Sequence, residues 1–97
     1  MTPSFTVRTT SRFEREARSL RKRHQREFTD QLRMAIDILE HDPYNRSRTH
    51  AIKKLEAVPS GEGQYRLRLH RFRFRYDIEA NNVTLCYCGL RRENTYR

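Results

Sequence analysis

The chain has 97 residues, of which 21 are lysine or arginine and 12 are aspartate or glutamate, so its formal net charge is +9. This length predicts a single domain over 1–97 with a modest core and no room for a second catalytic lobe. The charge favours nucleic acid, an anionic membrane surface or an acidic protein as the partner. No apolar run approaches the ~20 residues that span a bilayer, and the first ten residues lack a secretory signal, which together favour a cytoplasmic protein.

The first third of the sequence predicts a strand and then two helices. Alternating apolar residues predict a short strand over 4–9. Ser11 has the chemistry of a helix N-cap, and Glu14 three residues later completes a possible capping box. An apolar stripe then predicts a helix over about 12–23.

A second apolar stripe predicts a helix over about 25–40, which ends before Pro43. The two helices in succession predict a helical hairpin. The next stretch is irregular: 51–57 predicts a helical turn, and the glycine-rich 59–63 predicts a loop.

Residues 65–78 alternate basic and apolar side chains with a period of two, which predicts a β-hairpin with one apolar and one cationic face. A tight turn at His70 and Arg71 gives a consistent register. It pairs Leu69 with Phe72, Arg68 with Arg73, Leu67 with Phe74 and Arg66 with Arg75.

The predicted register places arginine opposite arginine twice. Cross-strand neighbours lie about 5 Å apart, where like charges are destabilising. Four arginines on one open face favour an anionic ligand, and the guanidinium fork matches the geometry of phosphate. The alternative is that a very basic protein simply presents its arginines to solvent, with no ligand.

The last predicted strand covers 83–88, after a turn at Asn81 and Asn82. Cys86 and Cys88 are the only cysteines, and strand alternation would point both to the same side, where they are poorly placed to form a disulfide with each other. The four histidines form no zinc-binding pattern with them, so we expect no metal and two buried thiols. The whole pattern predicts an α+β fold in two layers, with an N-terminal strand, a helical hairpin and a three-stranded antiparallel meander.

The hairpin contains a Tyr-Arg-Leu-Arg-Leu segment from Tyr65 and an Arg-Phe-Arg-Tyr segment from Arg73, and the chain ends with 89–96. Together with the order of the elements, these segments resemble the RelE/ParE superfamily of bacterial toxins, and the RelE branch most closely. The resemblance covers nearly the whole chain. It implies a RelE-like fold with a parallel pair formed by the first and last strands. It also implies the toxin of a type II toxin-antitoxin system, which cleaves messenger RNA in the ribosomal A site and needs no cofactor.

The resemblance also implies which residues act. The family's paired basic positions in the first hairpin strand fall on Arg66 and Arg68. Its arginine of the next strand falls on Arg73, its arginine after the glycine falls on Arg91, and its tyrosine near the end falls on Tyr96. The implied catalytic set is Arg68, Arg73, Arg91 and Tyr96, and the implied RNA-binding set is Arg66, Arg75, Arg92, Lys53 and Lys54. Lys53 and Lys54 equally fit a solvated basic turn.

The implied reaction is attack of a ribose 2′-hydroxyl on the adjacent phosphate, which needs a base, cations for the developing charge and an acid for the leaving oxygen. Arginine stays protonated, so Tyr96 is the expected base, with His70 or Lys54 as the next candidates. The expected partners are an acidic antitoxin, messenger RNA and ribosomal RNA. Two alternatives remain: a ParE-like inhibitor of DNA gyrase without nuclease activity, and a non-catalytic RNA- or ribosome-binding module.

Overall fold

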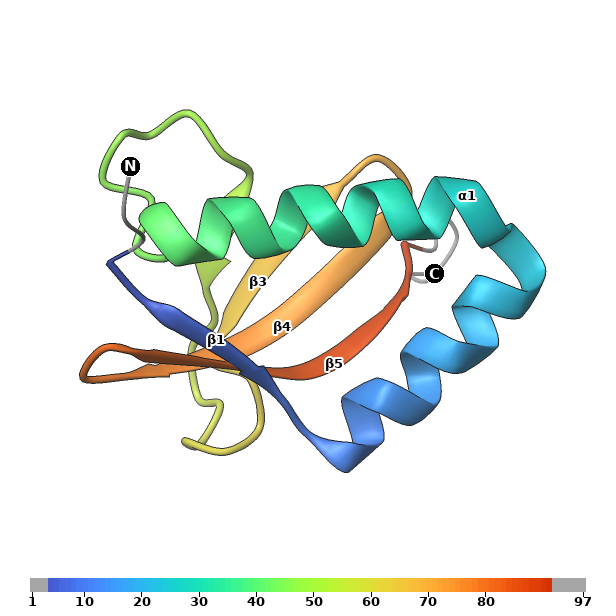
Figure 1. Cartoon of the computed structure of the whole chain (residues 1–97). Coiled ribbons are helices and arrows are strands. Elements are labelled where there is room, and N and C mark those ends of the chain that lie inside the picture. Colours follow the sequence, from blue (N-terminus) through green and yellow to red (C-terminus); the bar gives the residue numbers. More distant parts are fainter. Residues whose placement is uncertain (1–3, 92–97) are drawn as a thin grey trace, which may run out of the picture.

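The computed structural model describes residues 4–91 and consists of one bent helix packed on a five-stranded sheet (Figure 1). The elements follow in the order β1 (Thr6–Thr9), α1 (Ser11–His41), β2 (Ile52–Lys54), β3 (Tyr65–Leu69), β4 (Phe72–Glu79) and β5 (Asn82–Leu90). The strand order across the sheet is β1-β5-β4-β3-β2. β1 runs parallel to β5, and the other neighbours are antiparallel. The predicted two-layer α+β class and the parallel pair are therefore confirmed, and the sheet is mixed rather than a pure meander.

The helical layer differs from the predicted hairpin in its connection. α1 runs from Ser11 to His41 without a loop and bends at His24 and Gln25, whose backbone angles are not helical. The bend separates a first arm, 11–23, from a second arm, 26–41, which correspond to the two predicted helices (Figure 1). No proline or glycine lies at the bend. Contacts with the β3–β4 hairpin hold it instead: the His24 ring packs edge-on against Phe72 at 5.9 Å between centroids.

The N-cap of α1 is Thr10 rather than the predicted Ser11. The Thr10 hydroxyl accepts a hydrogen bond from the backbone N–H of Phe13 at 3.1 Å. Glu14 does not close a capping box, because its carboxylate accepts from the Thr9 hydroxyl at 2.6 Å. The prediction was wrong by one residue because the Thr10 N–H bonds to the carbonyl of Leu85, which keeps Thr10 in the extended conformation that a cap requires.

One core joins the two layers. Its fully buried members come from both arms of α1 and from β3, β4 and β5, and they include Phe13, Leu20, Phe28, Leu39, Leu67, Phe72, Phe74, Tyr76, Val83 and Leu85. The one hydroxyl among these side chains is satisfied, since Tyr76 donates to the carbonyl of Pro43 at 2.7 Å. None of the helices that the structure describes has the length and apolarity needed to cross a bilayer.

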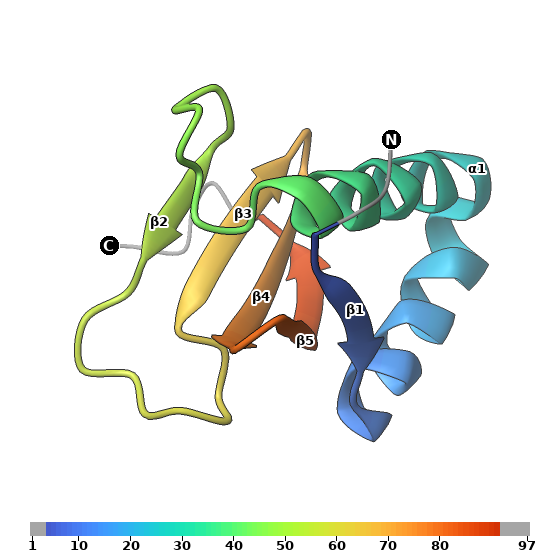
Figure 2. The ribbon, with the colours of Figure 1, turned by 60° about the vertical axis from the view of Figure 1, so that its left-hand side comes forward.

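The segment 51–57 contains a strand, β2, where the sequence predicted a helical turn (Figure 2). Ile52 lies opposite Leu67, and the carbonyl of Ala51 accepts a hydrogen bond from the backbone of Arg68. The local sequence does not predict this pairing, because β2 forms through backbone hydrogen bonds to the outer edge of β3, which lies later in the chain.

The two cysteines do not point to the same side of the sheet, as the sequence predicted, because a bulge interrupts the β4–β5 pairing at Arg75 and Tyr76. The Cys86 thiol contacts the Asp77 carboxylate at 3.3 Å, whereas the Cys88 thiol lies 4.0 Å from the carbonyl of Phe13 in α1. The two thiols therefore point to different sides of the sheet, because the extra residue of a bulge breaks strict alternation. Both thiols are free.

Candidate functional site

Four arginines of β3 and β4 lie on the sheet face opposite α1, and we call them the arginine face: Arg66, Arg68, Arg73 and Arg75. The structure confirms the predicted register, with Arg66 opposite Arg75 and Arg68 opposite Arg73. Their apolar neighbours along each strand point to the core. A period of two and a short turn thus place four guanidinium groups on one side of a two-stranded ribbon.

Two members of the arginine face, Arg68 and Arg73, carry charges that no described carboxylate compensates. Within residues 4–91, neither Arg68 nor Arg73 forms an ion pair with a carboxylate. The Arg73 Nε is buried and meets no hydrogen-bond acceptor among the described residues. Because a buried donor without a partner costs about 1–3 kcal/mol, this side chain is suited to an anion that supplies the missing acceptor.

Arg75 is engaged with the loop between β2 and β3. Its Nε donates to the carbonyl of Gly63 at 3.0 Å, and its Nη2 donates to the carbonyl of Glu62 at 2.9 Å. Gly63 has a φ of +82°, and a Cβ added there would lie 2.8 Å from the Arg75 Cβ. Arg75 therefore anchors this loop, and its implied role in RNA binding stays a prediction.

Asp77 completes the attachment of the same loop and was missed from the sequence. Its Oδ2 accepts from the backbone N–H groups of Gly61 and Gly63, and its Oδ1 accepts from that of Gln64. Burial, followed by the hydrogen bond to Asp77, raises the pKa of the Cys86 thiol to about 11. A signal was available, because Asp77 is the only acidic residue in the otherwise basic and apolar run 65–78.

The two lysines of β2 point to opposite faces of the sheet. Lys53 lies opposite Arg66, which places it on the side of the arginine face. Lys54 lies opposite Tyr65, and its ammonium is 5.6 Å from the centre of that ring, on the other side of the sheet. The structure therefore brings only Lys53 to the arginine face, because neighbouring residues of a strand point to opposite faces.

Arg91 lies at the hairpin end of the arginine face, directly after β5. Its backbone N–H donates to the carbonyl of Arg71 at 2.7 Å, and its Nη1 donates to the carbonyl of His70 at 2.9 Å. Both turn residues thus position Arg91. The other two site residues implied near the end of the chain, Arg92 and Tyr96, lie outside the described residues.

Tyr87 is a phenol at the arginine face that the sequence reasoning missed. It lies opposite Arg75, and its hydroxyl extends over Gly89, where an added Cβ would be only 2.7 Å away. Gly89 in turn lies opposite Arg73. The Arg12 guanidinium is 4.9 Å from the centre of the Tyr87 ring. Strand alternation gave the signal, because a residue next to the buried Cys88 must point away from the core.

One group of described residues has the ligand types of a metal site, namely Asp37, Glu40 and His41, whose ligand atoms lie within 4.8 Å of one another. This group belongs to the second arm of α1, in the other layer. The His41 ring is already bonded to the carbonyl of Asp37 at 2.9 Å. It has no part in the arginine face.

Comparison with solved structures finds this architecture in a known protein. The structure is similar to a chain of the archaeal RelE-RelB complex from Pyrococcus horikoshii OT3, with a TM-score of 0.62 and 25% sequence identity. The match covers 93% of this chain and 98% of the other. No protein-family model and no curated protein sequence matches the chain. The resemblance to RelE that the sequence indicates is thus confirmed by the three-dimensional structure, and the chain has a RelE-like fold.

Proposed function

We propose that this protein is the toxin of a type II toxin-antitoxin system and that it cleaves messenger RNA on the ribosome. The observation that carries the proposal is the opposed pair Arg68 and Arg73, whose charges lack carboxylate partners in the described residues, on a RelE-like sheet. Two phosphate-matching side chains at neighbouring positions suit a phosphoryl-transfer reaction better than a general attraction to polyanions.

In the proposed reaction, a ribose 2′-oxygen attacks the adjacent phosphorus and the bond to the 5′-oxygen breaks. The products are a 2′,3′-cyclic phosphate and a free 5′-hydroxyl. Arg73 and Arg68 would stabilise the extra negative charge on the phosphorane oxygens, because guanidinium N–H groups strengthen their hydrogen bonds as that charge develops. Arg91, held by the hairpin turn, would clamp the phosphate or assist the leaving oxygen.

Two proton transfers complete the reaction. The 2′-hydroxyl proton goes to a base, and the 5′-oxygen receives a proton from an acid. Tyr96 remains the base that the resemblance implies. Tyr87 is a second phenol for these transfers, supported by its position opposite Arg75 and by the reach of its hydroxyl over Gly89 towards the Arg73 position.

The proposed protein partner is an acidic antitoxin. The matched chain comes from a complex with RelB, and a net charge of +9 favours an acidic partner. Such a partner would neutralise the arginine face and keep it from RNA.

The test is to map 5′ ends on a translated messenger RNA after adding the purified protein, its Arg73→Gln variant or its Arg48→Gln variant. Arg48 is exposed and lies outside the arginine face, so it controls for the loss of one charge. We expect new 5′ ends with the parent protein and Arg48→Gln, and a loss of at least about 100-fold with Arg73→Gln. A mixture without ribosomes shows whether cleavage needs them.

Phenylalanine substitutions then assign the phenols. Tyr87→Phe and Tyr96→Phe are each tested for cleavage and for binding of a messenger RNA whose 2′-hydroxyls are replaced by hydrogen. The proton-transfer residue is the tyrosine whose substitution abolishes cleavage and leaves this binding unchanged. Full cleavage by Arg73→Gln would contradict the proposed site. An intact message with the parent protein would contradict the nuclease and direct attention to a DNA gyrase supercoiling assay.

A further inference from the structure

The turn between β3 and β4 contacts the helical layer through three polar residues, which we call the turn anchor: His24, Glu27 and Arg71. The Arg71 Nη2 donates to the Nδ1 of His24 at 2.9 Å, and the Arg71 Nε forms an ion pair with the Glu27 carboxylate at 3.3 Å. A guanidinium group only donates, so the His24 ring accepts in this contact. The turn anchor therefore attaches the tip of the arginine-bearing hairpin to α1 at its bend.

A buried aromatic contact lies next to the turn anchor. Phe72 directly follows Arg71 in the chain and is fully buried. Its ring lies edge-on to the His24 ring at the bend, at 5.9 Å between centroids, and edge-on to Phe28 on the second arm at 5.4 Å. Phe72 thus holds the hairpin against α1 through the core, and the polar contacts of Arg71 hold the turn itself.

The backbone of the same turn holds Arg91. The carbonyl of Arg71 accepts from the Arg91 backbone N–H at 2.7 Å, and the carbonyl of His70 accepts from the Arg91 Nη1 at 2.9 Å. His70 has a φ of +54°, a conformation that a residue other than glycine rarely adopts without support from its surroundings. A shift of the turn would move both carbonyl acceptors, so the position of the Arg91 guanidinium depends on what holds the turn.

Glu27 also keeps two like charges apart. A backbone hydrogen bond joins Arg71 to Arg91, so their guanidinium groups begin from adjacent positions at the end of the sheet. Like charges at adjacent positions repel and compete for the same anion. The ion pair with Glu27 directs the Arg71 side chain towards α1, which leaves Arg91 for the proposed site.

We propose that Arg71, held by His24 and Glu27, is a positioning residue that fixes the Arg91 guanidinium for the reacting phosphate. The inference rests on the proposed function, because Arg91 acts on a phosphate only there. A misplacement of about 1 Å can slow a reaction by up to about 100-fold. The turn anchor should therefore affect the rate of cleavage more than the affinity for RNA.

Loss of the turn anchor should leave the fold intact. The side chains of Arg71 and Glu27 are 54% and 44% exposed. Ion pairs with this exposure contribute little to stability, because water competes for both charges. Phe72 and the rest of the core remain in these variants, so a change in cleavage would report the turn and not unfolding.

The experiment measures three quantities: single-turnover cleavage of messenger RNA on ribosomes, binding of the same message with its 2′-hydroxyls replaced by hydrogen, and hydrogen exchange of the Arg91 backbone amide by NMR. It compares the parent protein with Arg71→Gln, with Glu27→Gln and with the matched control Glu79→Gln. Glu79 is exposed and lies at the far end of β4, and its substitution changes the net charge as Glu27→Gln does.

We expect Arg71→Gln and Glu27→Gln to slow cleavage about tenfold and to change binding about twofold or less. Glu79→Gln should cleave within about twofold of the parent protein. The first two substitutions change the net charge in opposite directions. A general attraction between the protein and RNA therefore predicts opposite effects, and only a shared positioning role predicts that both slow the reaction.

The Arg91 amide should exchange at least about fivefold faster in both slow variants. The Thr10 amide, which donates to the carbonyl of Leu85 in another part of the sheet, should exchange as in the parent protein. His24→Asn supplies a side-chain oxygen near the position of Nδ1 and should keep at least about half of the parental rate. His24→Leu lacks an acceptor and should be slow.

An unchanged Arg91 exchange rate in both variants would overturn the inference, as would parental cleavage by Glu27→Gln. Equal acceleration of exchange at Thr10 would also overturn it, because the substitutions would then loosen the whole sheet. Amide exchange needs no cleavage. If the parent protein leaves the message intact, faster exchange at Arg91 still supports the role of the turn anchor, and the proposed nuclease alone fails.

Discussion

The opposition of Arg68 and Arg73 across β3 and β4 is unfavourable for the free protein. Two unit charges about 5 Å apart repel by roughly 0.8 kcal/mol in bulk water and by more where solvent is partly excluded. The repulsion is present at a position where a glutamate in place of one arginine would form an ion pair instead. Sites that bind charged ligands commonly trade stability for function in this way.

Reversing one of these charges should separate stability from function. We expect Arg68→Glu to increase the free energy of unfolding by about 0.5–1 kcal/mol at low salt, because it replaces a repulsive cross-strand pair with an attractive one. The same change should abolish messenger cleavage. Urea unfolding followed by circular dichroism measures the first effect. Arg15→Glu, on the exposed side of α1, is the control, and a destabilised Arg68→Glu protein would contradict the repulsion.

The two thiols predict how stability depends on pH. Burial raises the pKa of Cys88 to about 12, and burial with the Asp77 hydrogen bond raises that of Cys86 to about 11. The folded protein therefore keeps both thiols protonated while the unfolded chain ionises near pH 8.5. The free energy of unfolding should fall as pH rises above about 8.5, because the unfolded state then releases protons that the folded state retains.

Thiol alkylation checks this prediction. At pH 8 the folded protein should react with iodoacetamide on the order of 100-fold more slowly than the urea-unfolded protein, because the thiolate is the nucleophile. A Cys86→Ala/Cys88→Ala variant should lose part of the decline in stability above pH 8.5. Equal alkylation rates for the folded and unfolded protein would contradict the shifted pKa values.

At the scale of elements, the loop between β2 and β3 is held by Arg75 and Asp77 rather than by its own sequence. Its two glycines both have positive φ but differ in their surroundings. A Cβ at Gly61 would meet nothing within 4 Å, whereas one at Gly63 would lie 2.8 Å from the Arg75 Cβ. Alanine substitutions at Gly61 and Gly63 therefore distinguish the effect of backbone strain from that of a steric clash.

Alanine at each glycine should show this difference. Gly61→Ala should lower the free energy of unfolding by about 1 kcal/mol through the left-handed backbone alone. Gly63→Ala should lower it by about 2–3 kcal/mol, because it adds overpacking against Arg75. Denaturant unfolding of both variants gives the comparison. Equal losses would mean that the loop moves away from Arg75 without cost.

The bend in α1 is an element-scale feature with consequences on both sides of the helix. Towards the sheet, it lets Leu20 on one arm and Phe28 on the other reach the same core. Towards the hairpin turn, Arg71 lies 2.9 Å from the His24 ring and forms an ion pair with Glu27 at 3.3 Å. Since the carbonyls of the same turn hold Arg91, the bend and the proposed site are mechanically linked.

At the scale of the whole molecule, one core spans both layers, and the first and last strands are paired in parallel. Neither layer can bury its apolar face alone. We expect a single cooperative unfolding transition, with the same urea midpoint by circular dichroism at 222 nm, which reports mainly the helix, and by tyrosine fluorescence, to which Tyr65, Tyr76 and Tyr87 of the sheet contribute. Midpoints that differ by more than the error of the fits would show that the layers unfold separately.

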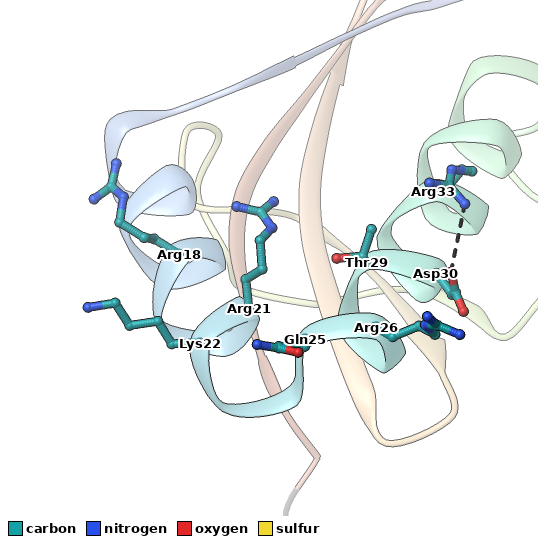
Figure 3. Close-up of a pocket in the computed structure, with 8 residues that line it drawn as sticks. All are labelled: Arg18, Arg21, Lys22, Gln25, Arg26, Thr29, Asp30 and Arg33. Atoms are coloured by element: carbon teal, nitrogen blue, oxygen red, sulfur yellow. Dashed lines mark ion pairs between the residues drawn. The ribbon is translucent and has the colours of Figure 1, made fainter.

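The molecule has basic surfaces on two sides, with the core between them. The arginine face lies on the sheet, and Arg18, Lys22 and Arg26 line a hollow at the bend of α1 (Figure 3). Cations therefore lie on both sides of the molecule rather than in one patch. This arrangement favours contact with anionic partners on both sides of the molecule.

The sequence by itself determined the features that depend on local periodicity. The alternation from Tyr65 to Ile78, with its short turn, settled the hairpin register and placed four arginines on one face, because side chains of a strand alternate strictly. The apolar stripes settled which side of each helical arm meets the core. The basic residues of the proposed site were identified from this pattern and from the resemblance it supports.

Only the tertiary structure decided the features that depend on distant partners. The strand β2 forms because β3 needs a neighbour, and the bend in α1 replaces a loop because both arms must reach one core. The β4–β5 bulge separates the two cysteines, and the loop between β2 and β3 is held by the distant carboxylate of Asp77. Such contacts join residues far apart in the chain, and no local pattern encodes them, since their energy appears only when the elements pack.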